Sequence, residues 1–285
     1  MIVDVHTHCH APEHWGAEHK RHWQGRYGGT PYPFVTPEKF DAVMHEGGID
    51  VAITFGLAAS RAGVRTPNDY VADFVDQLST PTIPFAAIDP IDEDWREQLE
   101  EAVQLGFSGV KLYPVLSLFD PTARDFDDFY QVLARHGMVL LWHMGASPSP
   151  VGKLAVSHPL VVDEVARRHP GLVQIMAHMG HPWQRDTNVV LRKNRRVFAD
   201  ISGVPSRPMD AFLGLVHAQE WGTVDQLLFG SDYPLWTPAE AIAKLRSVGE
   251  LRAGDLPHVT EETIHTILHQ NALDLLGLRH PNASN

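Results

Sequence analysis

Short apolar runs rich in β-branched residues alternate along this chain with segments whose apolar residues recur every three or four positions. Runs of the first kind are typical of buried parallel strands, and segments of the second kind are typical of helices with one apolar face. We expect eight strands, at residues 2–8, Val51–Phe55, Ile83–Ile88, Phe107–Tyr113, Met138–Trp142, Val173–Ala177, Val197–Ile201 and Gln226–Phe229. Eight strands that alternate with helices predict parallel βα units that close into a (β/α)8 TIM barrel.

The expected helices begin and end at recognisable residues. Thr36 offers a capping side chain, Pro37 suits a first helical turn, and Gly47 follows the apolar face of that helix. Further helices are expected at residues 71–78 and at about Glu261–Leu276. Three others begin near residues 95, 126 and 212 and stop at Gly106, Gly137 and Gly222, respectively. Two more begin at Pro159 and Pro238 and extend to residues 166 and 245. The last helix is expected to pack across the barrel. Residues 11–35 show no clear periodicity and are interpreted as a long loop, a feature that is usually functional.

These patterns describe one domain over residues 1–285, an α/β barrel with a C-terminal helix. The length of 285 residues is typical of one such barrel. The competing interpretation is an open, doubly wound sheet, but no Gly-x-Gly-x-x-Gly motif follows any expected strand. We find no sequence repeat, low-complexity segment or interdomain linker.

Composition narrows the function classes. The formal net charge of −12 argues against a nucleic-acid or anionic-membrane partner, since both favour a basic face. Cys9 is the single cysteine, so an internal disulfide is excluded and a reducing compartment is favoured. No apolar run reaches the ~18 residues that a bilayer span needs, and the first strand begins too early to leave room for a signal peptide. We therefore expect a cytoplasmic protein that acts on a small molecule.

Polar residues gather where the expected strands end. The carboxyl ends of barrel strands meet at one mouth, which is where the active sites of barrels lie. The residues in question are His6, His8, Lys111, His143, His178 and Asp232. His6 and His8 are two positions apart on one strand, so both imidazoles leave the same face. Imidazole and carboxylate ligands suit Zn²⁺ and other divalent metals, and a bound metal makes a water molecule acidic enough to supply hydroxide near neutral pH.

Each of these residues also has an ordinary explanation. A single histidine at a strand end is more often a hydrogen-bonded core or loop residue than a metal ligand. Asp232 precedes Tyr233-Pro234 and suits a turn or a helix cap equally well. The metal hypothesis depends on their joint occurrence at strand ends of the same polarity.

The chain resembles the metal-dependent amidohydrolase superfamily, and is most similar to its amidohydrolase 2 branch, which includes aminocarboxymuconate-semialdehyde decarboxylase. The resemblance spans essentially the whole sequence, and the ordered set of motifs is more specific than any one of them. The matching motifs are Val5-His6-Thr7-His8, Gly109-Val110-Lys111-Leu112-Tyr113-Pro114, Trp142-His143-Met144-Gly145, Ala177-His178-Met179-Gly180-His181-Pro182-Trp183, Asp200-Ile201-Ser202-Gly203, Phe229-Gly230-Ser231-Asp232-Tyr233-Pro234 and the closing residues 271–278.

The resemblance implies one divalent metal ion, usually Zn²⁺, held by four ligands, which are His6, His8, His143 and Asp232. His178 is then implied to be catalytic beside the metal-activated water, with a role as a fifth ligand as the alternative, and Asp232 shares the proton transfer. Lys111 has two interpretations. A carboxylated lysine bridges two metals in binuclear members, whereas an unmodified one would bind a substrate carboxylate or pair with an internal acid. We favour the mononuclear interpretation.

The substrate is expected to be a small organic ester, lactone, amide or carboxylic acid derivative that is hydrolysed by metal-activated water. Arg61 and Arg65 can bind a carboxylate, and the tryptophans Trp15, Trp23, Trp183 and Trp236 can wall a planar ring, although all six side chains can equally belong to solvated or packed loops. The principal alternative is a non-oxidative decarboxylase of an aromatic or muconate-type acid, and a ligand-binding barrel without chemistry is a third hypothesis. A homodimer is a candidate assembly that the sequence does not decide.

Overall fold

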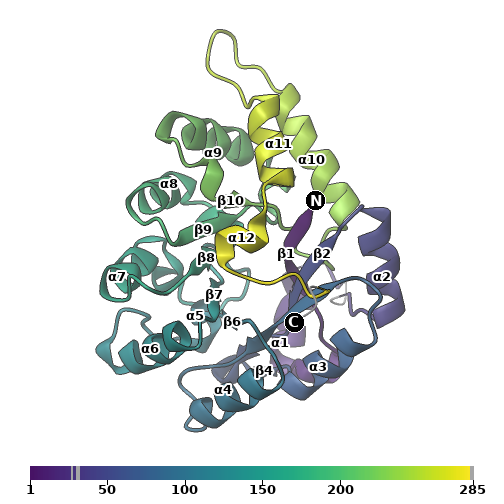
Figure 1. The fold of residues 1–285 in the computed structure, drawn as a ribbon, viewed down its shortest axis with the longest axis vertical. Helices are drawn as coiled ribbons and strands as arrows, with labels where there is room; N and C mark the ends of the chain where they lie inside the picture. Colours follow the sequence, from purple (N-terminus) through teal and green to yellow (C-terminus); the bar gives the residue numbers. More distant parts are fainter. Residues whose placement is uncertain (27, 30–32, 283–285) are drawn as a thin grey trace.

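Eight parallel strands form the centre of the computed structural model, which describes residues 1–26, 28–29 and 33–282 (Figure 1). The strands are β1 (Val3–His8), β2 (Val51–Phe55), β5 (Thr82–Ala87), β6 (Gly109–Leu112), β7 (Val139–Trp142), β8 (Gln174–Met176), β9 (Val197–Asp200) and β10 (Leu227–Leu228). They pair in chain order from β1 to β10. Backbone bonds from Val5 N to Phe229 O (3.0 Å) and from His8 N to Tyr233 O (2.8 Å) join the two ends, so the predicted barrel is confirmed.

The helices cover the outside of the barrel in the order expected of βα units (Figure 1). They are α2 (Pro37–Glu46), α3 (Asn68–Asp76), α4 (Trp95–Gln104), α6 (Asp127–Arg135), α7 (Leu160–Arg168), α8 (Gln184–Lys193), α9 (Pro208–Trp221) and α10 (Pro238–Glu250). The short α5 (Pro114–Ser117) lies instead in the loop after β6, where it packs in a buried cluster with Trp15 and Leu57. Side chains from alternate strand positions fill the barrel interior, where Val5, Phe85 and Leu141 belong to one buried cluster. Their neighbours point outward and pack against the helices, as Leu140 and Trp142 do. This alternation explains why each strand is apolar on both faces.

The sequence patterns missed α8, which lies between β8 and β9. The inward face of this helix is partly polar, because Thr187 and Asn188 are buried there beside Val190 and Leu191. Thr187 donates to Met179 O (2.7 Å), and the Asn188 amide donates to Gly214 O (3.1 Å). Hydrogen bonds therefore replace part of the apolar stripe on which the prediction of a helix depends.

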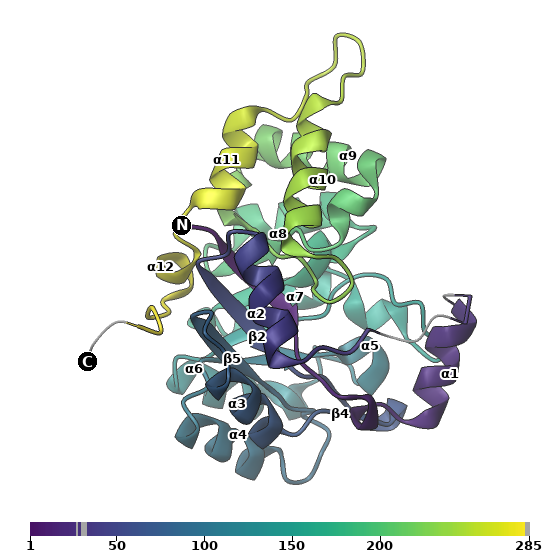
Figure 2. The same cartoon turned by 90° about the vertical axis from the view of Figure 1, so that its right-hand side faces the viewer.

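The long first loop is a second correction, since it contains a 3₁₀ turn (Pro12–His14) and α1 (Ala17–Arg26). Figure 2 shows α1 standing out from the body of the barrel, so little of it is buried and no apolar stripe marks it. The backbone of Gly16 donates to Gly63 O (2.8 Å), in the short hairpin of β3 (Ala58–Ala59) and β4 (Val64–Arg65). A side chain at Gly16 would approach that carbonyl oxygen to 2.9 Å, which explains the glycine. Residues 27 and 30–32 of the predicted loop lie outside the described residues.

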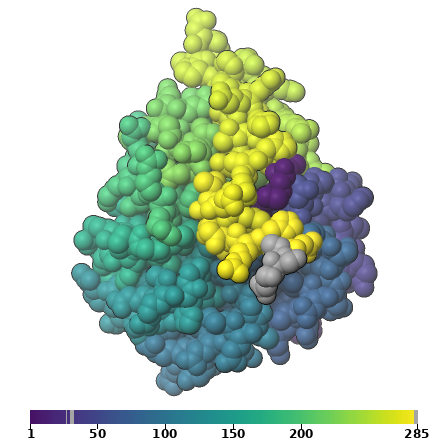
Figure 3. Space-filling view, viewed as in Figure 1, coloured from purple at the N-terminus to yellow at the C-terminus, as the bar shows by residue number. Residues whose placement is uncertain are grey.

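The expected last helix is divided into α11 (Glu261–His269) and α12 (Ala272–Leu276). Asn271 begins α12 by accepting a hydrogen bond from Asp274 N (3.4 Å). Leu273 and Leu276 join the same buried cluster as Val3 and Val5 of β1, so α12 covers one end of the barrel interior. Figure 3 shows the C-terminal residues spread over this face. Among the described helices, none is long and apolar enough to cross a membrane.

The packing of α12 gives a stability prediction. We expect Leu273→Ala to lower the free energy of unfolding by about 2–5 kcal/mol, because the side chain is buried and its loss leaves a cavity at the end of the barrel. Leu275→Ala on the same helix is the control, since that side chain is 38% exposed and its removal should cost much less. Urea denaturation measures both. Equal effects of the two substitutions would show that α12 does not seal the barrel.

Candidate active site

His6 is fixed by two aspartates at the carboxyl end of β1. Its Nδ1 lies 2.8 Å from Asp200 Oδ2, and its backbone nitrogen donates to Asp4 Oδ1 at 3.1 Å. All three residues are buried. A carboxylate accepts the proton of Nδ1, so Nε2 presents its lone pair on the other side of the ring.

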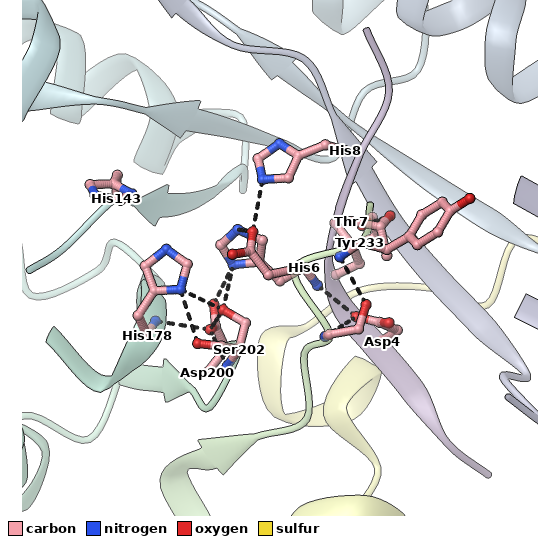
Figure 4. Close-up of polar contacts among 12 residues, drawn as sticks. Asp4, His6, Thr7, His8, His143, His178, Asp200, Ser202 and Tyr233 are labelled. Atoms are coloured by element: carbon pink, nitrogen blue, oxygen red, sulfur yellow. Dashed lines mark hydrogen bonds and ion pairs between the residues drawn. The ribbon is translucent and has the colours of Figure 1, made fainter. Parts of the chain in front are cut away.

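His178 is oriented in the same way from the end of β8. Its Nδ1 lies 2.8 Å from Ser202 Oγ and 3.1 Å from Ser202 O, and its backbone nitrogen donates to Asp200 Oδ1 at 3.0 Å. The Ser202 hydroxyl in turn donates to Asp200. One buried carboxylate therefore positions both histidines, directly for His6 and through Ser202 for His178 (Figure 4).

Asp232 faces these two histidines from the segment after β10. Its Oδ1 lies 3.1 Å from His8 Nε2 and 3.4 Å from His6 Nε2. The backbone nitrogen of Asp232 donates to His6 O (2.9 Å), which ties the segment to β1. Asp232 and His178 both have positive φ, of 65° and 57°. Such backbone conformations are unfavourable for these residue types and cluster at functional sites, where the surrounding contacts hold them.

His6, His178 and Asp232 each place one ligand atom within 4.8 Å of the other two, a spacing suited to one metal ion. His8 adjoins this group through its contact with Asp232. His143 lies near the group, with its ring centroid 5.1 Å from that of His178 and its Nε2 3.3 Å from Ala146 O. The structure thus brings all five predicted residues to one mouth, but it groups His178 rather than His143 with His6 and Asp232. The ligand roles assigned to His8 and His143 stay predictions.

Burial keeps three histidines of the site, His8, His143 and His178, neutral. It lowers the pKa of His178 to about 4 and the pKa values of His8 and His143 well below the ordinary value, with neighbouring positive groups adding to the effect. Asp200 behaves in the opposite sense. Burial alone would raise the pKa of Asp200, but His6, His178 and the Ser202 hydroxyl together hold it well below its ordinary range. Neutral imidazoles beside a carboxylate are the forms that bind divalent metals.

A cavity of about 510 Å³ opens above these residues. His8, His143, His178 and Asp232 line its floor, and its wall includes Trp15, Trp23, Lys111, Tyr113, Arg26, Arg207 and Trp236. Gly203 has no side chain to displace Trp236, whose ring lies 3.0 Å from the point where a Cβ would stand. The volume suits a small organic molecule with one ring.

Lys111 is buried at the end of β6, and its ammonium has no hydrogen-bond partner among the described residues. It lies 4.8 Å from the centre of the Phe55 ring. Burial lowers the pKa of Lys111 to about 7, although Asp200 and Asp232 act in the opposite direction. The cavity thus contains a basic group that has no hydrogen-bonding partner among the described residues and is available to a substrate anion.

Two of the predicted substrate-binding residues do not reach the cavity lining in the described part of the chain. The Arg61 guanidinium donates to Leu118 O (3.0 Å), and Trp183 packs against His158 with ring centroids 4.8 Å apart. Arg65 pairs with Asp92 at 2.7 Å. The loop after β2 that carries Arg61 and Arg65 is therefore held by surface contacts and is not directed at the mouth of the barrel.

The sequence reasoning assigned no role to Asp4, Asp200 or Ser202, which hold the histidines from behind. Asp200 and Ser202 are two positions apart and belong to a motif that was noted only as part of a resemblance. The signal that could have marked Asp200 is an acidic residue at the end of an otherwise apolar strand, since a buried carboxylate is rarely found without a partner.

The sequence profile of the amidohydrolase family matches residues 3–278. The chain belongs to this family. A comparison with curated protein sequences gives no match. The fold and the family together make this protein an enzyme of the amidohydrolase superfamily, with a candidate metal site at the mouth of the barrel.

Several solved structures share the fold at low identity. An uncharacterized TIM-barrel protein from Bordetella bronchiseptica is 19% identical with a TM-score of 0.74, and the alignment covers 97% of this chain and 98% of that one. A dihydroxybenzoic acid decarboxylase from Polaromonas, solved with bound manganese and an inhibitor, is 16% identical with a TM-score of 0.67 and coverage of 97% and 96%. A putative 2-pyrone-4,6-dicarboxylic acid hydrolase from Pseudomonas putida is 15% identical with a TM-score of 0.65 and coverage of 97% of each chain.

Asp200 is a target for a test of metal affinity. We expect Asp200→Asn to weaken divalent metal binding about 10–100-fold, because an amide no longer fixes the tautomer of His6. Calorimetric titration of metal-free protein measures the affinity, and circular dichroism checks that the fold is retained. Asp76→Asn, at an exposed position of α3, should leave the affinity unchanged. Unaltered binding by the Asp200 variant would contradict the positioning role.

Lys111 gives a prediction of pH dependence in the metal-free protein. Since its pKa falls from 10.5 to about 7 on folding, the unfolded chain binds one more proton between these values, and stability rises with pH across that interval. We therefore expect Lys111→Met to raise the free energy of unfolding by on the order of a few kcal/mol below pH 7, with the gain vanishing above about pH 10. Lys39→Met, at an exposed position of α2, should show no such dependence. Urea denaturation at several pH values over this range measures the difference in the free energy of unfolding between Lys111→Met and the wild type. A difference that does not change with pH would refute the prediction.

Proposed function

We propose that this enzyme is a metal-dependent hydrolase of a small organic ester, lactone, amide or carboxylic acid derivative. Its proposed cofactor is one divalent metal ion, Zn²⁺. One contact carries the proposal. The Nδ1 proton of His6 is directed to Asp200, so the Nε2 lone pair faces Asp232 Oδ1 across 3.4 Å. Two electron-rich atoms repel at that separation unless a cation or a proton lies between them.

The surrounding residues fit a metal ion. His6 Nε2 and His8 Nδ1 are buried without a hydrogen-bond partner in the described part of the chain, and two imidazoles already approach the same oxygen of Asp232. We propose His6, His8, His143 and Asp232 as ligands and keep a role for His178 as a fifth ligand as the alternative. A divalent metal held there supplies an activated water near neutral pH and polarises a substrate carbonyl.

The residues of the chain have distinct roles in this proposal. Asp200 and Ser202 hold two imidazoles in one tautomer, so that neither ring must reorient during the reaction. His178, neutral through burial, is able to accept a proton at Nε2 and return it to the leaving group, and the Asp232 carboxylate shares this transfer. Lys111 binds an anionic group of the substrate, and Trp236 lies against its planar part.

A non-oxidative decarboxylase is the second candidate. The observation that favours it is the charge of the cavity, whose described lining includes Lys111, Arg26 and Arg207, with Asp232 as its single acidic side chain. Such a lining suits a carboxylate substrate, which decarboxylation requires and hydrolysis merely permits. In this reaction His178 would first take up a proton from water at Nε2 and then donate it to the ring carbon as the bond to CO₂ breaks.

The remaining expectations from sequence are part of the proposal. We propose a cytoplasmic location and a small-molecule substrate, without a nucleic-acid or membrane partner. The net charge of −12 supports the exclusion of polyanionic partners. Cys9 is buried, and burial raises the pKa of its thiol to about 12, which makes it an unreactive core residue.

The two reactions are separated by following the atoms of the product. The protein is incubated with a panel of esters, lactones and aromatic carboxylic acids in H₂¹⁸O, and ¹⁸O incorporation and CO₂ release are recorded together. Hydrolysis predicts one ¹⁸O atom in the product without CO₂. Release of CO₂ without ¹⁸O in the organic product would instead support the decarboxylase.

His178→Asn applies the same assay to the mechanism. We expect turnover to fall about 10²–10⁴-fold with the metal content unchanged, because the proton carrier is lost while the ligands remain. His136→Asn, at an exposed site beyond α6, is the matched control. Loss of metal together with turnover would make His178 a ligand, and unchanged turnover would contradict both roles.

A further inference from the structure

A pair of histidines lies on the solvent-facing side of α11, away from the cavity. His265 and His269 are four residues apart, so they follow one another on the same face of the helix. Both side chains are exposed, and their ring centroids lie 4.7 Å apart. Glu261 is exposed one turn earlier on this face, at the start of the helix. The face therefore presents two imidazoles and a carboxylate at successive turns.

The position of this pair separates it from the candidate active site. His269 is close enough to the chain start for the terminal amine of Met1 to act on it, together with Arg246 and Asp50. Figures 1 and 2 place the chain start beside α11 and α12, and Figure 2 shows α1 on the far side of the molecule. Met1 precedes β1, whereas the cavity residues follow the carboxyl ends of the strands.

We propose that His265 and His269 form a surface binding site for a divalent transition-metal ion such as Ni²⁺, Cu²⁺ or Zn²⁺, independent of the cavity site. Imidazoles four residues apart on a helix can ligate one ion together, and neutral imidazole is the form that binds. Once the first nitrogen is bound, the second binds as if at high local concentration, so the pair holds the ion far better than either histidine alone. Glu261, one turn before His265, adds a negative charge on the same face.

Partial burial and the neighbouring His265, Met1 amine and Arg246 lower the pKa of His269, while Asp50 acts in the opposite direction. This imidazole is consequently neutral over a wider pH range than an isolated one. The proposal has a consequence for the metal content of the enzyme. A second equivalent of metal in the purified protein would come from α11, and it would not indicate a binuclear centre at Lys111.

The test is a calorimetric titration with Ni²⁺ of the untagged, full-length chain after removal of bound metal by a chelator. The variants are His265→Ala and His269→Ala, both at exposed positions where the fold is not at risk. We expect each variant to bind the α11 equivalent about 10²-fold more weakly than the wild type. His45→Ala on α2 removes an exposed histidine with no histidine four residues away, and it should leave the isotherm unchanged.

The outcomes are separable from those of the proposed function. Isotherms of both α11 variants identical to that of the wild type would overturn the inference, as would a loss of affinity in the His45 variant of the same size. Loss of the α11 equivalent in a protein whose cavity binds no metal would support the surface site while contradicting the proposed hydrolase. Lys111→Met should not change the number of bound ions, and a drop by one in that variant alone would place the second ion in the cavity and refute the proposal.

Discussion

The buried carboxylate of Asp200 is the group on which the candidate site depends. It accepts from the ring of His6, from the backbone of His178 and from both the backbone and the hydroxyl of Ser202. These donors keep it charged in a place where burial alone would favour the protonated form. With that charge fixed, both imidazoles adopt the tautomer that leaves Nε2 toward the cavity. Removal of the carboxylate would loosen both rings, because it contacts the His6 ring directly and the His178 ring through the Ser202 hydroxyl.

The closure of the barrel is coupled to this site. β10 is only two residues long, and the sheet is completed by the segment that follows it, which pairs with β1 through Phe229 and Tyr233. Asp232 lies within that segment and takes its positive φ there. Asp4, two residues before His6, accepts from Ser231 N (3.0 Å) and ties the same segment to β1. β1 and the segment after β10 therefore close the barrel and also carry His6, His8 and Asp232. The same backbone contacts stabilise the fold and position the site.

The electrostatics of the cavity differ from those of the whole molecule. The chain carries a formal net charge of −12, but the described lining of the cavity includes Lys111, Arg26 and Arg207 and has Asp232 as its single acidic side chain. Burial keeps His8 and His143 neutral and lowers the pKa of Lys111 to about 7. A cation that enters among these neutral imidazoles meets little repulsion. In its protonated form the Lys111 side chain is available to an anionic substrate, because it has no hydrogen-bonded carboxylate among the described residues. An acidic chain and a mouth lined by more basic than acidic side chains are thus compatible.

Several elements followed directly from the sequence because their causes are local. The apolar run at Val51–Phe55 is β2 to the residue, and Thr36 caps α2 as its hydroxyl suggested. The strand-end positions of His6, Lys111, His143, His178 and Asp232 followed from the polarity of parallel strands. Helix α8 could not be predicted in this way, because polar side chains on its buried face form hydrogen bonds to Met179 and Gly214. Both partners lie outside the helix, so no periodic pattern marks them. Arg61 and Trp183 were expected at the mouth because they lie in loops, and loop direction is set by surface contacts that no periodicity encodes.

The sequence by itself determined the barrel, its family and the edge at which the chemistry gathers, since these depend on alternation, capping and strand polarity along a continuous chain. The tertiary structure alone decided which nitrogen of each ring faces the cavity, that His178 rather than His143 is grouped with His6 and Asp232, and that Asp200 governs them. The physical reason is that a hydrogen bond such as that between His6 and Asp200 joins residues 194 positions apart, and its direction exists only once the barrel has closed.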